Sequence, residues 1–245
     1  YIISTGVASL PAASGSRLSG TTTNRIHPAD AANCFKLTIS ASGQRALTYP
    51  GSTPNVSRYV IRGAEIAPLN DTFSVSTLVL LQPSTGANDA ANYASYIELN
   101  QCYIHGVTLT TNGITTAVRF EVPQGKIKDC WISHIANAGN AEAKCILTIS
   151  NPGYSSVQNT FVQAAGESFF VGGGDPAIPG HVPGDIFYDV IHSHRPYEWN
   201  NRPPSYDGSY TGANKNAASS SSATASVCNG SSLRTAGRVD KTAIS

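Results

Sequence analysis

The chain has 245 residues, with 16 Lys and Arg against 15 Asp and Glu, so its formal net charge is +1. Charged residues make up only 13% of the sequence, too few to build the basic patch that nucleic acids or anionic membrane surfaces require, and neither is expected as the main partner. Hydrophobic residues make up 40%, but no apolar run approaches the roughly 18 residues of a spanning helix, so we expect no membrane span.

The remaining composition is typical of an all-β protein. Ser (29), Thr (21), Gly (22) and Pro (14) are abundant, and as a group they favour strands and turns over helices. The sequence begins at Tyr1 and contains no Met, which we interpret as a processed product or a fragment. Five Cys and the sequons at Asn55, Asn70 and Asn229 favour an extracellular protein, secreted or at the cell surface.

Five β-rich segments recur along the chain, and each ends at an aliphatic residue. They are residues 59–66, 97–104, 127–132, 157–162 and 186–191, and their ends are 38, 28, 30 and 29 residues apart. A second set of strands is predicted between them, at residues 78–82, 117–122, 144–150 and 168–173. Three nearly equal spacings indicate a structural repeat with at least two strands in each period.

A stacked solenoid explains this repeat better than antiparallel hairpins, because two-residue Asn-Gly or Asp-Gly turns do not join the strands. Stacking places equivalent residues above one another. The position before each segment end holds Glu65, Tyr103, Trp131, Phe161 and Val190, and the position before that holds Ala64, Cys102, Cys130, Thr160 and Asp189. We interpret Trp131 as a core residue. Because stacked strands are about 4.8 Å apart, Cys102 and Cys130 either form a disulfide or lie as two buried free thiols.

Residues 157–199 resemble a block of the secreted bacterial right-handed parallel β-helix repeat proteins of the pectate-lyase-like superfamily. The matching elements are AAGE at 164–167, GGGDPAIPGHVPGDI at 172–186 and HRP at 194–196, preceded by similar stretches at 10–18, 28–37 and 99–106. The resemblance implies a right-handed parallel β-helix over residues 1–199. Beyond it, we expect residues 200–245, rich in Ser, Ala and Gly, to be an irregular C-terminal extension that packs on the helix or on a neighbouring subunit.

Polysaccharide hydrolases of this fold carry recognisable catalytic segments, and none of those segments is present in this sequence. The best local set of ionisable side chains is Glu167, Asp175, His181 and Asp185. These residues either form a metal- or sugar-binding loop, with Ca²⁺ as ligand only if the protein is a lyase, or cap turns in a structural loop. We therefore expect no cofactor and no metal site, and favour a protein that is not an enzyme.

A second cluster follows the last predicted strand and consists of His194, Arg195, Tyr197 and Trp199. Aromatic rings beside an Arg suit stacking on sugar rings, so these four residues are candidates for a carbohydrate-binding surface. The alternative is that the aromatic side chains cover the end of the core.

These observations favour an extracellular structural protein. The first predicted coil has no cap, and a solenoid end without a cap exposes apolar core and an unpaired strand edge. We therefore expect self-association, end to end, into a fibre or a surface layer, with a polysaccharide as a further partner. The alternatives are a polysaccharide lyase or glycoside hydrolase of the same superfamily, and a carbohydrate-binding surface module.

Overall fold

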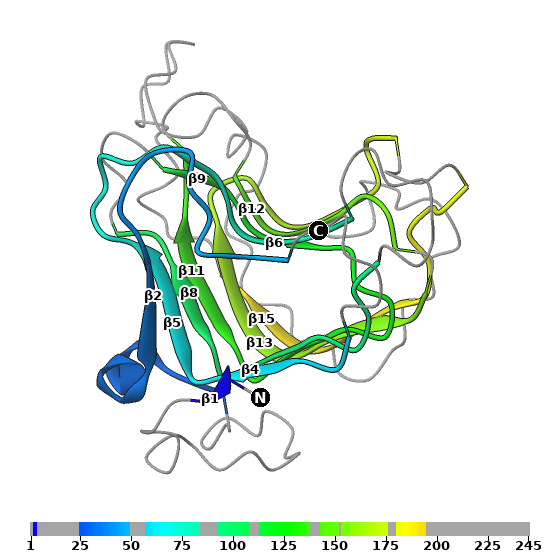
Figure 1. The fold of residues 1–245 in the computed structure, drawn as a ribbon, viewed down its shortest axis with the longest axis horizontal. Coiled ribbons are helices and arrows are strands. Elements are labelled where there is room, and N and C mark those ends of the chain that lie inside the picture. Colours follow the sequence, from blue (N-terminus) through cyan, green and yellow to red (C-terminus); the bar gives the residue numbers. More distant parts are fainter. Residues whose placement is uncertain are drawn as a thin grey trace, which may run out of the picture.

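The structure is a computed structural model that describes the backbone of residues 2–3 and, with side chains, residues 25–49, 57–83, 93–107, 113–137, 143–151, 153–175 and 180–194. In this part of the chain the only helix is a short 3₁₀ helix, η2 (Pro28–Asn33), and the other regular elements are β-strands (Figure 1). The all-β prediction is therefore confirmed. No helix in the same residues is long and apolar enough to cross a membrane. The predicted extension, residues 200–245, lies outside the described residues.

The strands form two sheets in which every pair is parallel. Sheet A contains, in spatial order, β1 (Ile2–Ile3), β4 (Val60–Arg62), β7 (Glu98–Asn100), β10 (Lys126–Lys128), β13 (Ser155–Ala164), β11 (Trp131–Ile135), β8 (Tyr103–His105), β5 (Ala64–Pro68) and β2 (Phe35–Ile39), with β15 (Ile186–Ser193) paired to β13. Sheet B contains β14 (Glu167–Val171), β12 (Lys144–Thr148), β9 (Ile114–Phe120), β6 (Val75–Leu81) and β3 (Leu47–Thr48). In the order of sheet A, β13 lies between β10 and β11. This long strand pairs with β10 along its first half and with β11 along its second half.

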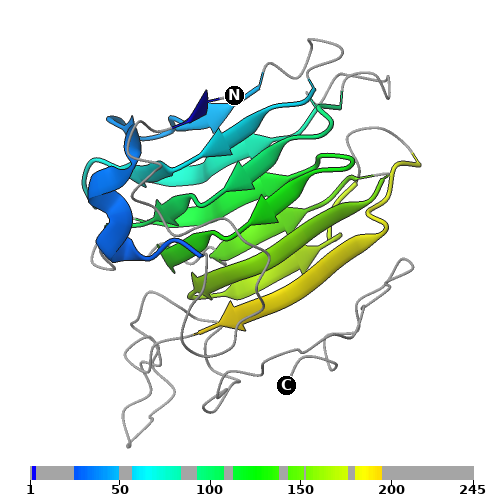
Figure 2. The same cartoon turned by 90° about the horizontal axis from the view of Figure 1, so that it is seen from below.

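The chain passes from sheet A to sheet B and returns to sheet A one strand further along. We call one such passage a circuit. The register shows its length, because Leu99 pairs with Ile127, 28 residues later, and Ile127 pairs with Val157, 30 residues later. Both predicted sets of strands are therefore confirmed, the second as the β6, β9, β12 and β14 strands of sheet B. Figure 2 shows the circuits stacked side by side from β2 to β15.

Each passage through sheet A from β4 onward bends at an equivalent residue with a left-handed backbone, and β11 has a further left-handed residue at His134 (φ 55°). The equivalent residues are Gly63 (φ 73°), Gln101 (φ 48°), Asp129 (φ 56°), Asn159 (φ 43°) and Val190 (φ 53°). Each follows a residue that pairs with its counterpart in a neighbouring circuit, so the bends stack. The bends turn β5, β8 and β11 away from β4 in Figure 1. Side chains link the bends, since Arg62 Nε donates to Gln101 Oε1 at 2.9 Å and Asn159 Nδ2 donates to Asp129 Oδ1 at 2.6 Å.

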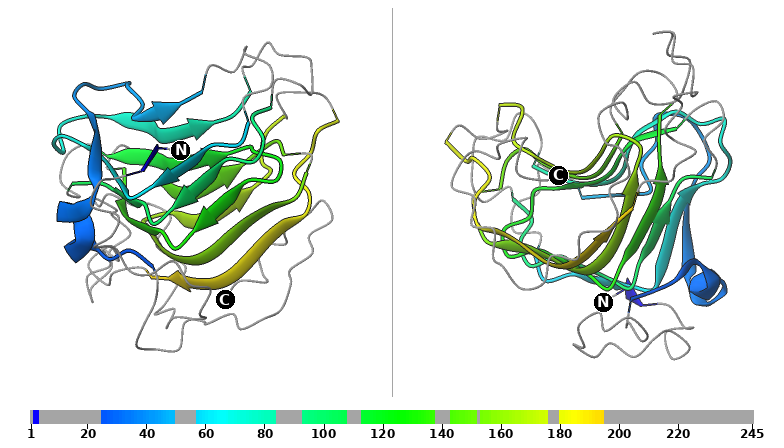
Figure 3. Two further views of the ribbon diagram at one scale, coloured as in Figure 1. Left: turned by 60° about the horizontal axis from the view of Figure 1, so that its bottom comes forward. Right: turned by 180° about the vertical axis from the view of Figure 1, so that it is seen from behind.

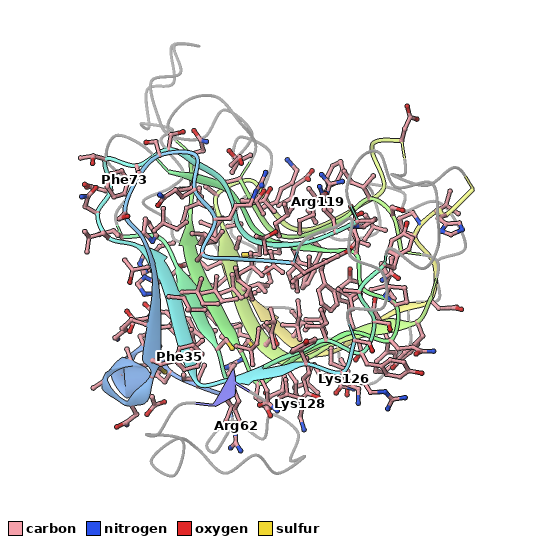
Figure 4. The ribbon with its side chains drawn as sticks, viewed as in Figure 1. Phe35, Arg62, Phe73, Arg119, Lys126 and Lys128 are labelled. Atoms are coloured by element: carbon pink, nitrogen blue, oxygen red, sulfur yellow. The ribbon has the colours of Figure 1, made fainter. Side chains whose placement is uncertain are left out.

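Aliphatic side chains of successive circuits stack in columns to form the core between the sheets. Ile66, Ile104 and Ile132 pair in register and are fully buried. Sheet B contributes a matching column of Val79, Val118 and Ile146. Burying one such side chain contributes about 1.5–3 kcal/mol. Charged residues lie on the opposite side of sheet A, as Figure 4 shows for Arg62, Lys126 and Lys128.

The structure corrects the register predicted for the last segment. The prediction placed Val190 at the position of Phe161 and Asp189 at that of Thr160. Instead, Phe161 pairs with His192 and Thr160 pairs with Ile191. The cause is the length of the last circuit, in which equivalent residues are 31 apart, so that the segment is shifted by two positions.

Trp131 lies on the outer face of sheet A, and its predicted place in the main core is wrong. Strict alternation from buried Ile127 would point residue 131 inward, but the left-handed bend at Asp129 shifts the alternation by one residue. Cys130 and Ile132 therefore point into the core, and Trp131 points outward. Its ring stacks on that of Phe161, with 4.0 Å between the ring centroids.

Residues 25–34, which we call the strap, cover this outer aromatic column. Figure 3 shows the η2 part of the strap outside sheet A. Ile26 is fully buried against Tyr103 and donates its backbone N–H to the carbonyl of Asp129 at 3.0 Å. The guanidinium carbon of Arg25 lies 5.3 Å from the Trp131 ring centroid and 5.8 Å from that of Phe161. The strap therefore joins neighbouring circuits through backbone, apolar and cation–π contacts.

Replacing Arg25 with Ala tests the strap. Because Arg25 is buried over two aromatic rings, we expect Arg25→Ala to lower the free energy of unfolding by about 2 kcal/mol, measured by urea denaturation. Arg45→Ala is the matched control, because Arg45 is exposed. A loss no larger than that of the control would contradict the role given to the strap.

Candidate functional site

Polar side chains gather where the strands of sheet B end. Tyr49 directly follows β3, Gln82 follows β6 and Glu121 follows β9. Because parallel strands end at the same edge of a sheet, residues from different circuits meet there. The group, which we call the Glu121 cluster, consists of Tyr49, Tyr93, Arg119, Glu121, Ser150 and His181, together with Gln82, which the pairing of Leu81 with Phe120 places beside Glu121.

Glu121 is the ionisable centre of this cluster and is fully buried. Its Oε1 accepts a hydrogen bond from Arg119 Nε at 2.7 Å. Burial raises the pKa of the Glu121 carboxyl, while the nearby charge and hydrogen bond of Arg119 and the backbones of Ile149 and Ser150 act in the opposite direction. The second carboxyl oxygen, Oε2, is buried, and within the described part of the chain it has no hydrogen-bond partner. Arg119 is partly exposed, and Figure 4 places it on the outer side of sheet B.

Tyr93 joins the cluster through a chain of hydroxyl groups. Its hydroxyl is hydrogen-bonded to Ser150 Oγ, and Ser150 Oγ donates to the carbonyl of His181 at 3.0 Å. Since the hydroxyl hydrogen of Ser150 is used in the second bond, Tyr93 is the donor in the first. The rings of Tyr93 and His181 stack, with 5.6 Å between their centroids. Burial raises the pKa of Tyr93 and of Tyr49, which keeps both hydroxyls protonated and able to donate.

Neither Glu121 nor Arg119 is predicted as a site residue from the sequence. Both lie in the predicted strand 117–122, where two charged residues at alternate positions indicate a solvent-facing pair. The neighbours of Glu121 come from other circuits, since Tyr49 and Tyr93 are close enough to interact with it electrostatically. The one sequence feature that could have indicated this site is the presence of a basic and an acidic residue, Arg119 and Glu121, in the otherwise apolar predicted strand 117–122. Chemically, the cluster can hold a proton on a buried carboxyl and accept hydrogen bonds from a ligand.

Of the four ionisable residues considered either as a binding loop or as caps in a structural loop, His181 alone belongs to the Glu121 cluster. Glu167 begins β14, where it pairs in register with Lys144. Asp175 and Asp185 are exposed, and Asp185, with φ 47°, directly precedes β15. Among the residues that the structure describes, no three His, Cys, Asp or Glu side chains come together as metal ligands. The four residues thus do not form a metal-binding group.

The predicted carbohydrate-binding residues are described only in part. His194 is exposed, and its ring centroid lies 6.3 Å from that of Phe161, at the end of the outer aromatic column. Arg195, Tyr197 and Trp199 lie outside the described residues. Their role in binding a sugar stays a prediction.

Asn70 is the one predicted glycosylation site within the described residues, and Asn55 and Asn229 lie outside them. Asn70 is partly exposed in the turn after β5. Its side-chain oxygen accepts hydrogen bonds from the backbone N–H and the hydroxyl of Thr72, at 3.0 and 2.5 Å. Modification of this residue stays a prediction.

Cys102 and Cys130 are free thiols in the structure, which is the second of the two predicted alternatives. Both are fully buried, and the backbone N–H of Cys102 donates to Cys130 Sγ at 3.4 Å. Equivalent side chains on neighbouring parallel strands point the same way, a direction that does not favour an S–S bond. Cys34 and Cys145 are also buried and free, and burial raises the pKa of Cys34 to about 11. Cys228 lies outside the described residues.

Comparisons with known proteins identify no relative of the chain. No family model, curated protein or solved structure matches the chain. The resemblance of residues 157–199 to the pectate-lyase-like repeat proteins therefore stays a prediction. Inferences about function rest on the geometry of the strands and of the Glu121 cluster.

The buried carboxyl of Glu121 makes stability depend on pH. Because its pKa is raised in the folded protein, the folded state binds the proton more tightly than the unfolded chain, and this stabilisation is lost as the pH rises through the raised pKa. We therefore expect the free energy of unfolding of Glu121→Gln, relative to wild type, to increase as the pH rises above the ordinary glutamate pKa of 4.5 and to level off above the raised pKa of Glu121. Urea denaturation at several pH values measures the difference. A pH profile that matches that of the exposed-site variant Asp175→Asn would contradict the expectation.

Proposed function

We propose that the chain is a right-handed parallel β-helix with a structural role outside the cell. The parallel pairing of every strand and the regular passage between sheets A and B support the fold. Connections between parallel strands of one sheet are right-handed in nearly all proteins. The resemblance of residues 157–199 to secreted parallel β-helix proteins supports the same assignment, and the sequons favour the extracellular setting.

The observation that carries a structural role is an apolar strand edge at the N-terminal end of the stack. Within the described residues, β2 pairs only with β5 and β3 pairs only with β6. Phe35, Leu37 and Leu47 on these two strands pack against the core but are only partly buried, and Figure 4 marks Phe35 on β2. An edge of this kind offers backbone groups and apolar surface to a further parallel strand.

The opposite end of the stack has a matching edge. Among the described strands, β14 pairs only with β12, and β15 pairs only with β13. If the register of the columns continues from one molecule into the next, Ile191 lies beside Phe35 and Phe169 lies beside Leu47. Apolar residues therefore meet apolar residues at both positions, which makes a second copy of this chain the fitting occupant.

Such a contact is head to tail and does not close, so it produces a filament or a layer instead of a closed oligomer. The enzymatic alternative, a polysaccharide lyase or hydrolase, has less support. Hydrolysis of a glycoside uses two carboxylates that face the same bond, whereas the Glu121 cluster contains a single carboxylate among its described members.

An edge substitution tests assembly. We expect the wild-type chain to form concentration-dependent, elongated oligomers in sedimentation velocity and negative-stain microscopy, and Leu37→Lys to abolish them, because it places a charge in the apolar contact. Thr38→Lys is the matched control, since Thr38 lies on the same strand and is exposed, and it should assemble as wild type does. A wild-type chain that stays monomeric at every concentration would contradict the proposal.

A further inference from the structure

The Glu121 cluster contains buried hydrogen-bond acceptors that its own donors do not reach. Glu121 Oε2, Gln82 Oε1 and His181 Nδ1 are all buried, and no described residue donates a hydrogen bond to them. Three of the donors in the cluster are already used, because Arg119 Nε donates to Glu121 Oε1 and the Tyr93 and Ser150 hydroxyls donate along their chain. A buried acceptor without a donor costs roughly 1–3 kcal/mol. Three in one place point to donors supplied from outside the cluster.

Two of these acceptors occupy neighbouring positions. Leu81 pairs with Phe120, and the backbone N–H of Glu121 donates to the carbonyl of Leu81 at 2.8 Å. Gln82 and Glu121 follow these paired residues, so they lie side by side on adjacent strands. Because adjacent strands are about 4.8 Å apart, two neighbouring hydroxyl groups of one small molecule can donate to both side-chain oxygens.

The charges in the cluster select a neutral ligand. The Glu121 carboxylate is already paired with Arg119 at 2.7 Å. A cationic ligand would add a second positive charge beside this buried pair, and an anionic ligand would face the unpartnered oxygens of Glu121 and Gln82. A neutral donor satisfies the acceptors without burying further charge.

We propose that the Glu121 cluster is a binding site for a neutral molecule with vicinal hydroxyl groups, which donate to Glu121 Oε2 and Gln82 Oε1. His181 Nδ1 accepts a third hydrogen bond when Nε2 carries the ring hydrogen. Arg119 and His181 are partly exposed and form the side of the cluster that solvent reaches. The proposed acceptors follow β6 and β9 or lie at residue 181, and none of them is on β2 or β3, so binding does not require assembly.

Three sugars that share one ring and differ in charge test this site: D-glucose is neutral, D-glucuronate is anionic and D-glucosamine is cationic. Saturation-transfer NMR with titration of the full chain measures binding. We expect D-glucose to bind more tightly than either charged sugar, and Glu121→Gln to weaken its binding about tenfold, because the bond to a charged acceptor is lost.

Two further variants keep the test decisive. Gln82→Leu removes the second acceptor without touching the buried ion pair, and it should weaken D-glucose binding even if Glu121→Gln does not fold. Asp175→Asn is the control, since Asp175 is an exposed carboxylate, and its affinity should equal that of wild type. No binding of D-glucose, tighter binding of D-glucuronate, or equal affinity in wild type and Gln82→Leu would each overturn the proposal.

Discussion

The parallel, in-register pairing of successive circuits is the constraint on which the rest of the structure depends. Once Leu99 pairs with Ile127 and Ile127 with Val157, every other position of these circuits is fixed beside its equivalent. Each core residue packs against its equivalents in the neighbouring circuits, which favours columns of one residue class such as Ile66, Ile104 and Ile132. The same rule stacks Trp131 on Phe161 outside the sheet and Cys102 beside Cys130 inside it.

The left-handed bend in each passage through sheet A decides which side chains are core and which are surface. A bend at Asp129 turns Cys130 inward and Trp131 outward, and this outward turn produces the aromatic column that the strap covers. Polar side chains at the bends can also bond from one circuit to the next, as Asn159 does with Asp129 at 2.6 Å. Packing, polar bonding and the outer surface therefore follow from one backbone feature repeated along the stack.

Much of this architecture could be predicted from the sequence because a stacked fold repeats its signal. Spacing and residue class predicted both sets of strands and placed Cys102 beside Cys130. Two features of the structure could not be predicted from spacing and residue class. The outward position of Trp131 depends on one left-handed φ angle at Asp129, which alternation does not reveal. The burial of Glu121 depends on contacts between circuits, and in the sequence Glu121 and Arg119 resemble an ordinary surface pair in a strand.

The central claim is that neighbouring circuits pair as parallel strands in the stated register. Hydrogen-bond scalar couplings in NMR measure this directly, because each coupling joins one amide nitrogen to the carbonyl that accepts from it. The structure predicts couplings from the Trp131 amide to the Cys102 carbonyl and from the Phe161 amide to the Cys130 carbonyl, both with N···O distances of 3.0 Å. Reciprocal couplings, in which two residues exchange both bonds as antiparallel strands do, would contradict it.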